Sequence, residues 1–390
     1  MSLARALGIA VLACLALSTP DRAAAQTTFP NIKLQGRLQE QFYFFGNGDF
    51  GAATGPKSNV FTRRARIEAR GQINEYVTVY VQPSVEGGRT APSSSCRSTL
   101  DTLTSTVTTT CTNGTTGIRL RDAWIDVRLT KSEARTAFTV RVGQEKRPFS
   151  RYELTSSNNL PSIERGGGRG LLAVQSNDLF GSAQLLAHDV GAHLQLDHKL
   201  GATRMLSLVA GAYNGRGESL NDNNDAKSVG FRATADVTAK LSVGGSYFSH
   251  DNIVGADSAL RNYGYGLDAQ WGKPGEEGLF VLAEWLQGKG IPASVAVDKP
   301  SIRGVQGLAA YNIRMKSPTS WLYAIEPSVR VDVADPNTDA GGDRATLITA
   351  VLGFYISSKA QFRVGVEHQS FQAAGAGSIS GVRSALTVNF

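Results

Sequence analysis

The sequence has few cysteines, few prolines and no long apolar run beyond its first residues. The lack of a long apolar run excludes membrane proteins that span the bilayer with helices. Of 390 residues, 3 are cysteine and 13 are proline. After residue 25, no stretch approaches the about 18 consecutive apolar residues that a membrane-spanning helix requires, which excludes helical spans. Lysine and arginine form no run of the kind that binds nucleic acid. We therefore interpret the net charge of +7 as distributed and expect no nucleic-acid partner.

The first residues have the pattern of an export signal. Arg5 supplies a positive charge, residues 7–17 form a short apolar core, and alanines at 23–25 fit a small-residue cleavage site. We expect residues 1–25 to be a cleaved signal peptide and residues 26–390 to form a single mature domain. Cys14 allows lipidation as an alternative, although Leu12 fits that cleavage motif poorly.

Two cysteines remain after that cleavage, Cys96 and Cys111, both in the serine- and threonine-rich stretch 89–117. Exported proteins reach an oxidising compartment, where two cysteines in one loop can form a disulfide. Metal binding is the alternative, but neither a histidine nor a third cysteine lies close to them in the sequence. We expect a disulfide, no metal site and no cofactor.

Polar and apolar residues alternate with a period of two through most of the remaining chain, which is typical of β-strands. For example, Thr62 and Arg64 fall on one face and Phe61 and Ala65 on the other, with Arg63 as the exception. About sixteen strands are expected, at residues 31–45, 59–72, 75–87, 118–130, 136–146, 188–200, 203–213, 227–238, 240–250, 260–271, 278–288, 304–314, 320–333, 344–356, 360–371 and 380–390.

The connections between these strands alternate between short and long. Asn74 and residues 239–240 are short turns, whereas residues 88–117 and 147–187 are long and polar. Short turns at one end and long loops at the other are typical of outer-membrane barrels. The last strand ends in an aromatic residue, Phe390, with apolar residues at alternate positions before it. It resembles the segment that the barrel-assembly machinery recognises, and we expect that machinery as a partner.

Strands that cross a membrane close into a barrel, because each unpaired backbone group in hydrocarbon would cost several kcal/mol. The fold class is therefore expected to be all-β, a transmembrane antiparallel β-barrel in outer-membrane lipid of a Gram-negative-type bacterium. With about sixteen strands, the lumen is too wide for side chains to fill and admits water. Aromatic side chains expected on the lipid face, mostly near strand ends, are Phe42, Phe44, Tyr263, Tyr265, Trp271, Trp285, Trp321, Tyr323, Phe354 and Phe390.

Glu40 is an exception on this lipid face, beside Phe42. A carboxylate is costly there. Three explanations stay open: a place at the membrane rim, a subunit interface, or a slip of the strand register.

Several segments resemble the phosphate-selective porin family, whose members are anion-specific channels for phosphate and pyrophosphate. They are residues 61–71, 120–126 and 140–149, followed by 153–157 and 163–165. The resemblance implies a homotrimer of sixteen-stranded barrels. It also implies that part of residues 147–187 folds into the lumen as a constriction loop, which carries Arg151, Arg165 and Arg169. An exposed surface loop is the alternative for that segment.

Anions that cross a low-dielectric membrane need compensating positive charge, and arginine offers several donors to phosphate oxygens. The alternation places candidate anion-track residues on the lumen side: Arg37, Arg64, Arg66, Arg70, Arg128 and Arg141. Lumenal carboxylates can instead pair with these arginines across strands. The lumen is also poor in lysine, unlike the family's lysine ladders, so the preferred anion stays open.

Three functions are alternatives to an anion-preferring passive porin. One is a structural or adhesive surface protein anchored by the barrel, which no extra passenger domain supports; the other two are channel and enzyme functions. The channel function is that of a general, non-specific diffusion porin. The enzyme function is that of an outer-membrane barrel hydrolase, which needs a nucleophile and an activating base. His188, His193 and His198 lie near one strand, but no Gly-x-Ser-x-Gly or His-Glu-x-x-His motif accompanies them. We therefore expect no catalytic residues and no enzymatic activity.

Overall fold

The computed structural model describes residues 29–45, 58–86, 94–101, 106–113, 118–131, 133–165, 175–215, 217–218, 225–253, 259–290, 300–316, 321–372 and 377–390. The expected signal peptide and Arg169 lie outside the described residues. In the described part, no helix is long and apolar enough to span a membrane.

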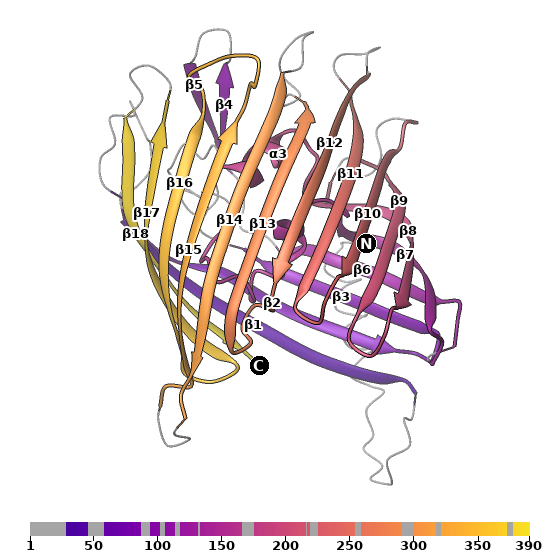
Figure 1. Ribbon diagram of the computed structural model, residues 1–390. Coiled ribbons are helices and arrows are strands. Elements are labelled where there is room, and N and C mark those ends of the chain that lie inside the picture. The colour runs from indigo at the N-terminus through magenta and orange to yellow at the C-terminus, as the bar shows by residue number, and fades with distance from the viewer. Residues whose placement is uncertain are drawn as a thin grey trace.

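Sixteen antiparallel strands close into a single barrel, in which β18 returns to pair with β1 (Figure 1). The predicted fold class and strand positions are confirmed, and most strand ends shift by only a few residues. The barrel strands are β1 (Asn31–Phe45), β2 (Ser58–Gln72), β3 (Val77–Val85), β6 (Ile118–Arg128), β7 (Thr136–Lys146), β8 (His188–Lys199), β9 (Met205–Tyr213), β10 (Ser228–Asp236), β11 (Leu241–Ile253), β12 (Ala259–Trp271), β13 (Gly278–Lys289), β14 (Ser301–Arg314), β15 (Ala324–Asp335), β16 (Ala345–Tyr355), β17 (Ala360–Phe371) and β18 (Ser378–Asn389).

Two long connections contain secondary structure that the sequence did not predict. The β3–β6 connection forms a separate hairpin of β4 (Ser94–Asp101) and β5 (Thr106–Asn113). Its register places Cys96 directly opposite Cys111. The expected disulfide stays a prediction. The β7–β8 connection contains two short helices, α2 (Arg151–Leu154) and α3 (Ser176–Ser182).

Several short turns share one local device, a side-chain oxygen that accepts the backbone N–H groups two and three residues further on. Asn74 Oδ1 accepts two such bonds at 2.8 Å, Thr238 Oγ1 accepts bonds of 3.1 and 2.9 Å, and Ser357 Oγ accepts bonds of 3.1 and 3.0 Å. Asn, Thr and Ser favour turns for this reason. These turns let consecutive strands pair as antiparallel neighbours.

The barrel closes at the chain terminus. Phe390 N donates to Gly36 O at 2.9 Å, and Gly36 N donates to Phe390 O at 2.8 Å. A Cβ on Gly36 would lie 2.3 Å from the Phe390 ring, so only glycine lets the ring lie on β1. The terminal aromatic residue therefore packs against the first strand.

A β-bulge in β2 adds an arginine to the inner wall. The pairing of β1 with β2 moves from Gln39–Arg64 to Glu40–Thr62, so Arg63 is the extra residue and has no cross-strand partner. A bulge breaks the strict alternation and re-aims a side chain. The Arg63 exception in the sequence pattern is therefore the site of the bulge.

The bulge also corrects the faces that alternation assigned to the residues before it. Phe61 was expected on the outer face, but it packs against the buried Tyr43 on the inner side. Thr62 was expected inside, but it is exposed on the outer side and donates to Glu40 at 2.8 Å. Because side chains alternate with a period of two, one extra residue reverses every face beyond it.

A second irregularity has the same result in β6. The pairing of β3 with β6 moves from Gln82–Asp122 to Pro83–Leu120, and Arg121 is left as the extra residue. The side chain of Arg121 contacts carboxylates of the inner wall, as described below. Both breaks in the alternation therefore add an arginine to the inside of the barrel.

Candidate pore lining and inner loop

The connection between β7 and β8 lies against the inner wall, and we call its described parts, residues 147–165 and 175–187, the inner loop. Its first residue, Arg147, is buried and donates from Nη2 and Nε to Asp189 Oδ2 at 2.8 and 3.1 Å. Arg147 Nη2 also donates to Gly215 O at 2.8 Å. A buried charge needs both a counter-charge and further hydrogen bonds, and Arg147 has them. These contacts fix the start of the inner loop to β8 and to the β9–β10 connection.

Helix α2 is held by carboxylates of β12 and β13. Glu284 of β13 accepts hydrogen bonds from Ser150 Oγ at 2.7 Å, from the backbone N–H of Arg151, and from Gln306 Nε2 at 2.8 Å. The Arg151 guanidinium forms an ion pair with Asp268 of β12. Arg151, expected on the constriction loop, is therefore bound to the wall.

Apolar side chains of the inner loop pack in two buried clusters against the inner wall. Phe149 and Phe180 are fully buried, with ring centroids 6.0 Å apart. They belong to a cluster that also contains Ala183, Leu185, Leu186, Tyr213, Phe248, Leu286 and Ile302. A second cluster joins Tyr152 and Leu160 to inward-facing residues of β13 and β14. The apolar contacts with the wall thus keep the loop inside the barrel.

The inner loop reaches the wall opposite its root. Arg330 of β15, eight strands from β7 in the ring of sixteen, donates to Arg165 O at 2.8 Å, and its guanidinium lies 4.5 Å from the Tyr152 ring centroid. Ser157 Oγ accepts from Arg37 Nη1 at 3.2 Å. The loop therefore crosses the barrel from one side to the other.

Glu153 joins several parts of the inner loop to the end of β7. Its carboxylate lies 3.2 Å from Lys146 Nζ and 3.7 Å from Arg165 Nε, and it accepts from Asn177 Nδ2 at 2.7 Å. Burial alone would raise the pKa of Glu153, but the positive charges of Lys146 and Arg165 outweigh burial and lower this pKa to about 2. Glu153 is therefore ionised at neutral pH.

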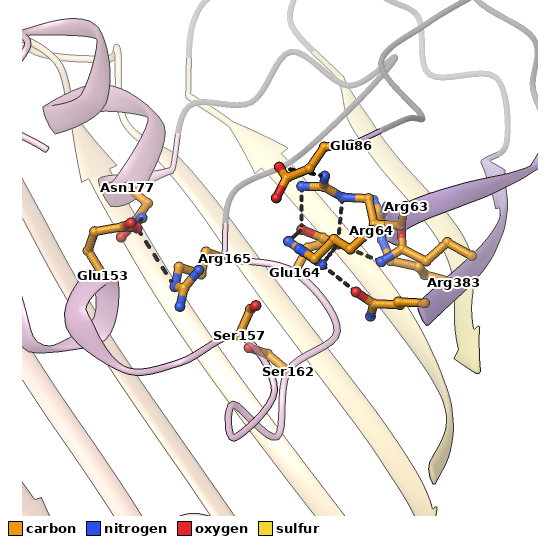
Figure 2. A network of polar contacts seen from close by, with 12 residues as sticks. Arg63, Arg64, Glu86, Glu153, Ser157, Ser162, Glu164, Arg165, Asn177 and Arg383 are labelled. Carbon is orange, nitrogen blue, oxygen red and sulfur yellow. Dashed lines mark hydrogen bonds and ion pairs between the residues drawn. The ribbon is translucent and has the colours of Figure 1, made fainter. Parts of the chain in front are cut away.

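Glu164 lies near the end of the first described part of the inner loop, residues 147–165, between two arginines of β2 (Figure 2). Arg63 donates to its two carboxylate oxygens at 3.0 Å from Nε and 3.2 Å from Nη2. Arg64 donates to the same two oxygens at 3.0 Å from Nη1 and 3.0 Å from Nη2. Gln41 Nε2 adds a further bond. Paired donors from a guanidinium are the geometry by which arginine binds carboxylates and phosphates.

Glu86 is the second carboxylate of this region. It forms an ion pair with Arg66 and lies 3.6 Å from Arg63 Nη1 and 3.8 Å from Arg121 Nε. Arg121 also forms an ion pair with Glu218. The arginines added by the two bulges thus meet at one carboxylate.

The structure separates the six candidate anion-track arginines into groups. Arg37 and Arg64 are buried and contact the inner loop. Arg66 pairs with Glu86, whereas Arg70 is exposed and lies opposite Lys33 in the register. Arg70 is thus the candidate with the greatest access to solvent.

Arg128 and Arg141 lie further along the wall. Arg128 donates to the backbone oxygens of Thr130 and Lys131 at 3.1 and 3.2 Å. Arg141 donates to Asp126 at 2.6 and 2.8 Å and to Glu145 at 3.0 Å. The positive charge of Arg141 is therefore balanced by carboxylates of β6 and β7.

Sequence reasoning missed three residues of this site: Arg63, Arg121 and Glu164. The sequence does contain a sign of Arg63, because this residue interrupts the polar–apolar alternation beside Arg64. Glu164 lies in a segment that matched the family by resemblance, but nothing in its local sequence indicates a partner 100 residues away.

Comparison with known proteins identifies the family. The profile of the phosphate-selective porin O and P family matches residues 32–264, more than half of the chain. The chain belongs to the phosphate-selective porin O and P family. No curated protein sequence matches it. As a porin with a closed sixteen-stranded barrel, the protein is a passive channel of the outer membrane, and the inner wall and inner loop line that channel.

Solved outer-membrane channels have the same fold. The anion-selective porin of Comamonas acidovorans is 10% identical, with a TM-score of 0.57 over 92% of this chain and 99% of that chain. OmpF of Salmonella typhi in complex with daunomycin is 12% identical, with a TM-score of 0.57 over 93% and 98%. DcaP of Acinetobacter baumannii is 14% identical, with a TM-score of 0.55 over 94% and 99%. At these identities the likeness concerns the fold alone.

Proposed function

We propose that this porin prefers small anions, such as phosphate or pyrophosphate, and works in the outer membrane of a Gram-negative-type bacterium. The observation that carries the proposal is an excess of arginine where the inner loop meets the wall. Arg37, Arg63, Arg64, Arg66 and Arg121 gather there, and the carboxylates that interact with them are Glu68, Glu86, Glu164 and Glu218. Five positive charges against four negative ones leave a net charge of +1, which favours anions in a pore.

The inner loop supports this proposal as a constriction. It crosses the barrel: Arg151 pairs with Asp268 of β12, Arg330 of β15 donates to Arg165 O, and the Arg165 side chain pairs with Glu153 within the loop. A loop fixed at both walls narrows the water-filled cross-section and brings permeant ions close to the arginines. Arg169 is proposed to belong to the same loop.

A general diffusion porin is the second candidate, because much of the wall is locally neutral. Arg141 is matched by Asp126 and Glu145, and Arg383 donates to Glu367 at 2.8 Å. Cross-strand pairs of this kind add no net charge to the lumen.

Planar-bilayer conductance of the refolded protein tests the proposal. In a KCl gradient we expect a reversal potential set mainly by chloride, and we expect low concentrations of phosphate or pyrophosphate to block the chloride current. A current carried mainly by cations and insensitive to phosphate would leave a channel without anion preference.

We also propose that the channel is a homotrimer. OmpT of Vibrio cholerae, 10% identical with a TM-score of 0.52, over 92% of this chain and 99% of that chain, was solved in a trimer form. In the present chain, Glu40 lies on the outer face of β1 with Thr62 as a hydrogen-bond partner. Thr62 donates its hydroxyl hydrogen to Glu40, and Ser384 adds a further outward hydroxyl group, so this face carries polar groups that can bind a second copy.

The remaining expectations concern export and assembly. We propose cleavage of residues 1–25, a disulfide between Cys96 and Cys111, and contact of the outer face with membrane lipid. Recognition by the barrel-assembly machinery would use β18 and Phe390, which closes the barrel against Gly36.

A further inference from the structure

The arginines Arg63 and Arg64 form a site with the geometry of an anion cradle, and we call this pair the arginine fork. The bulge in β2 brings two successive guanidinium groups to the same side of the strand. Between them they direct four N–H groups, at 3.0 to 3.2 Å, to one pair of oxygens. In a regular strand, adjacent side chains point to opposite faces, so the fork exists because of the bulge.

The occupant of the arginine fork belongs to the protein. The Glu164 side chain is 6% exposed, and those of Arg64 and Arg63 are 5% and 18% exposed. Burial would raise the pKa of Glu164, but Arg63 and Arg64 hold it well below its ordinary value. An ionised carboxylate therefore takes the place that the oxygens of a permeating anion would take.

We propose that Glu164 is an internal ligand of the arginine fork and that it sets how strongly this pore binds anions. The inference rests on the proposed anion preference and names the residue that limits it. With Glu164 in place, one of the two positive charges of the fork is balanced and its four N–H donors are occupied, so the fork contributes little to anion binding. Without that carboxylate, the fork is a doubly charged site for a small oxyanion.

A second carboxylate, Glu86, lies 3.6 Å from Arg63, but Arg66 and Arg121 share it. Glu367 is bound to Arg383. Arg37 adds positive charge from β1, with Ser157 as its hydrogen-bond acceptor. Loss of the Glu164 charge therefore leaves the fork with an uncompensated positive charge.

The first variant is Glu164→Gln, which keeps the shape of the side chain and removes its charge. We expect inorganic phosphate to block the chloride current at a concentration at least about tenfold lower than in the wild type, because charge-assisted bonds to the fork become available to phosphate. The reversal potential in a KCl gradient shifts further toward that of chloride.

Two further variants separate this effect from other causes. Arg64→Gln breaks the same contact but removes a positive charge, so we expect phosphate to block the current less strongly than in the wild type. If a loosened inner loop caused the change in Glu164→Gln, then Glu164→Gln and Arg64→Gln would change the phosphate block in the same direction. Glu367→Gln removes a lumenal carboxylate that does not touch the fork. We expect it to shift the reversal potential without the tenfold change in phosphate block.

The outcomes are distinguishable. Equal phosphate block in the wild type and Glu164→Gln overturns the inference, and so does stronger block in Arg64→Gln or an equal gain in Glu367→Gln. A cation-selective wild type overturns the proposed anion preference. If phosphate still blocks Glu164→Gln at a lower concentration than the wild type in that case, the proposed role of Glu164 is supported independently of the anion preference.

Discussion

At the scale of the residue, Gly143 shows how the wall accommodates a large ring. Trp124 of β6 stacks on Tyr80 of β3, with ring centroids 5.0 Å apart, and Arg141 of β7 lies 3.7 Å from the Trp124 ring centroid. Gly143 pairs with Trp124 in the register and has a φ of +138°, which side chains rarely tolerate. A Cβ there would lie 2.2 Å from Ala123 O. Glycine is therefore required where β7 passes this column of rings.

Gly143→Ala should lower the free energy of unfolding by about 1–3 kcal/mol, because the added methyl group meets backbone atoms that cannot move aside. Urea unfolding of the protein refolded into lipid vesicles measures the change. The matched control is Gly307→Ala in β14, where no atom lies within 4 Å of the new Cβ, and we expect little change there. Equal stability of the two variants would contradict the proposed requirement for glycine.

Residue-level prediction from the sequence works where one strand contains the whole signal. The period of two predicts the inner face for Arg64 and Arg66, and both lie there. It fails for Phe61 and Thr62, because the bulge at Arg63 is set by pairing with the neighbouring strand. A bulge depends on two strands at once, so the alternation of one strand shows only an exception.

At the scale of the element, strands and the inner loop differ in how far their sequences specify them. All sixteen barrel strands are predicted because each carries its own alternation over several residues. Helices α2 and α3 have 4 and 7 residues, too few for a helical period. Contacts with residues more than 100 positions away, such as Glu284 with Ser150, hold the loop in place. A local sequence pattern does not contain such contacts.

The low pKa of Glu153 predicts how the inner loop responds to acid. Because its pKa is lowered to about 2, below the ordinary value of about 4.3, the ionised carboxyl stabilises the loop at neutral pH, and this contribution is lost as the pH falls through about 2. We expect open-channel current noise to stay constant from pH 7 to about pH 4 and to increase nearer pH 2. Glu153→Gln should be noisier than the wild type at neutral pH. A wild-type increase already at pH 5 would be inconsistent with this assignment.

At the scale of the whole molecule, the outer wall is uneven. Outward aromatic residues lie along β1, β10–β14, β16 and β17, for example Phe42, Phe231 and Tyr265. In β2, β3 and β6 the aromatic residues face inward, and the outer faces carry mainly valine, alanine, isoleucine and leucine. Aromatic girdles are typical of surfaces at the lipid interface. The wall formed by β2, β3 and β6 therefore suits contact with a second copy better than contact with lipid.

This asymmetry predicts which outer positions tolerate a large side chain. Ile67 of β2 and Leu267 of β12 both point outward and are 59% and 63% exposed in the single chain. Ile67→Trp should dissociate the trimer, because an overpacked contact costs about 1–3 kcal/mol, whereas Leu267→Trp faces lipid, which accommodates the ring. Native mass spectrometry in detergent measures the oligomer, and conductance shows whether each barrel still folds. If the trimer persists in Ile67→Trp but dissociates in Leu267→Trp, the interface lies on the wall that contains β12. A monomeric wild type would contradict the proposed homotrimer.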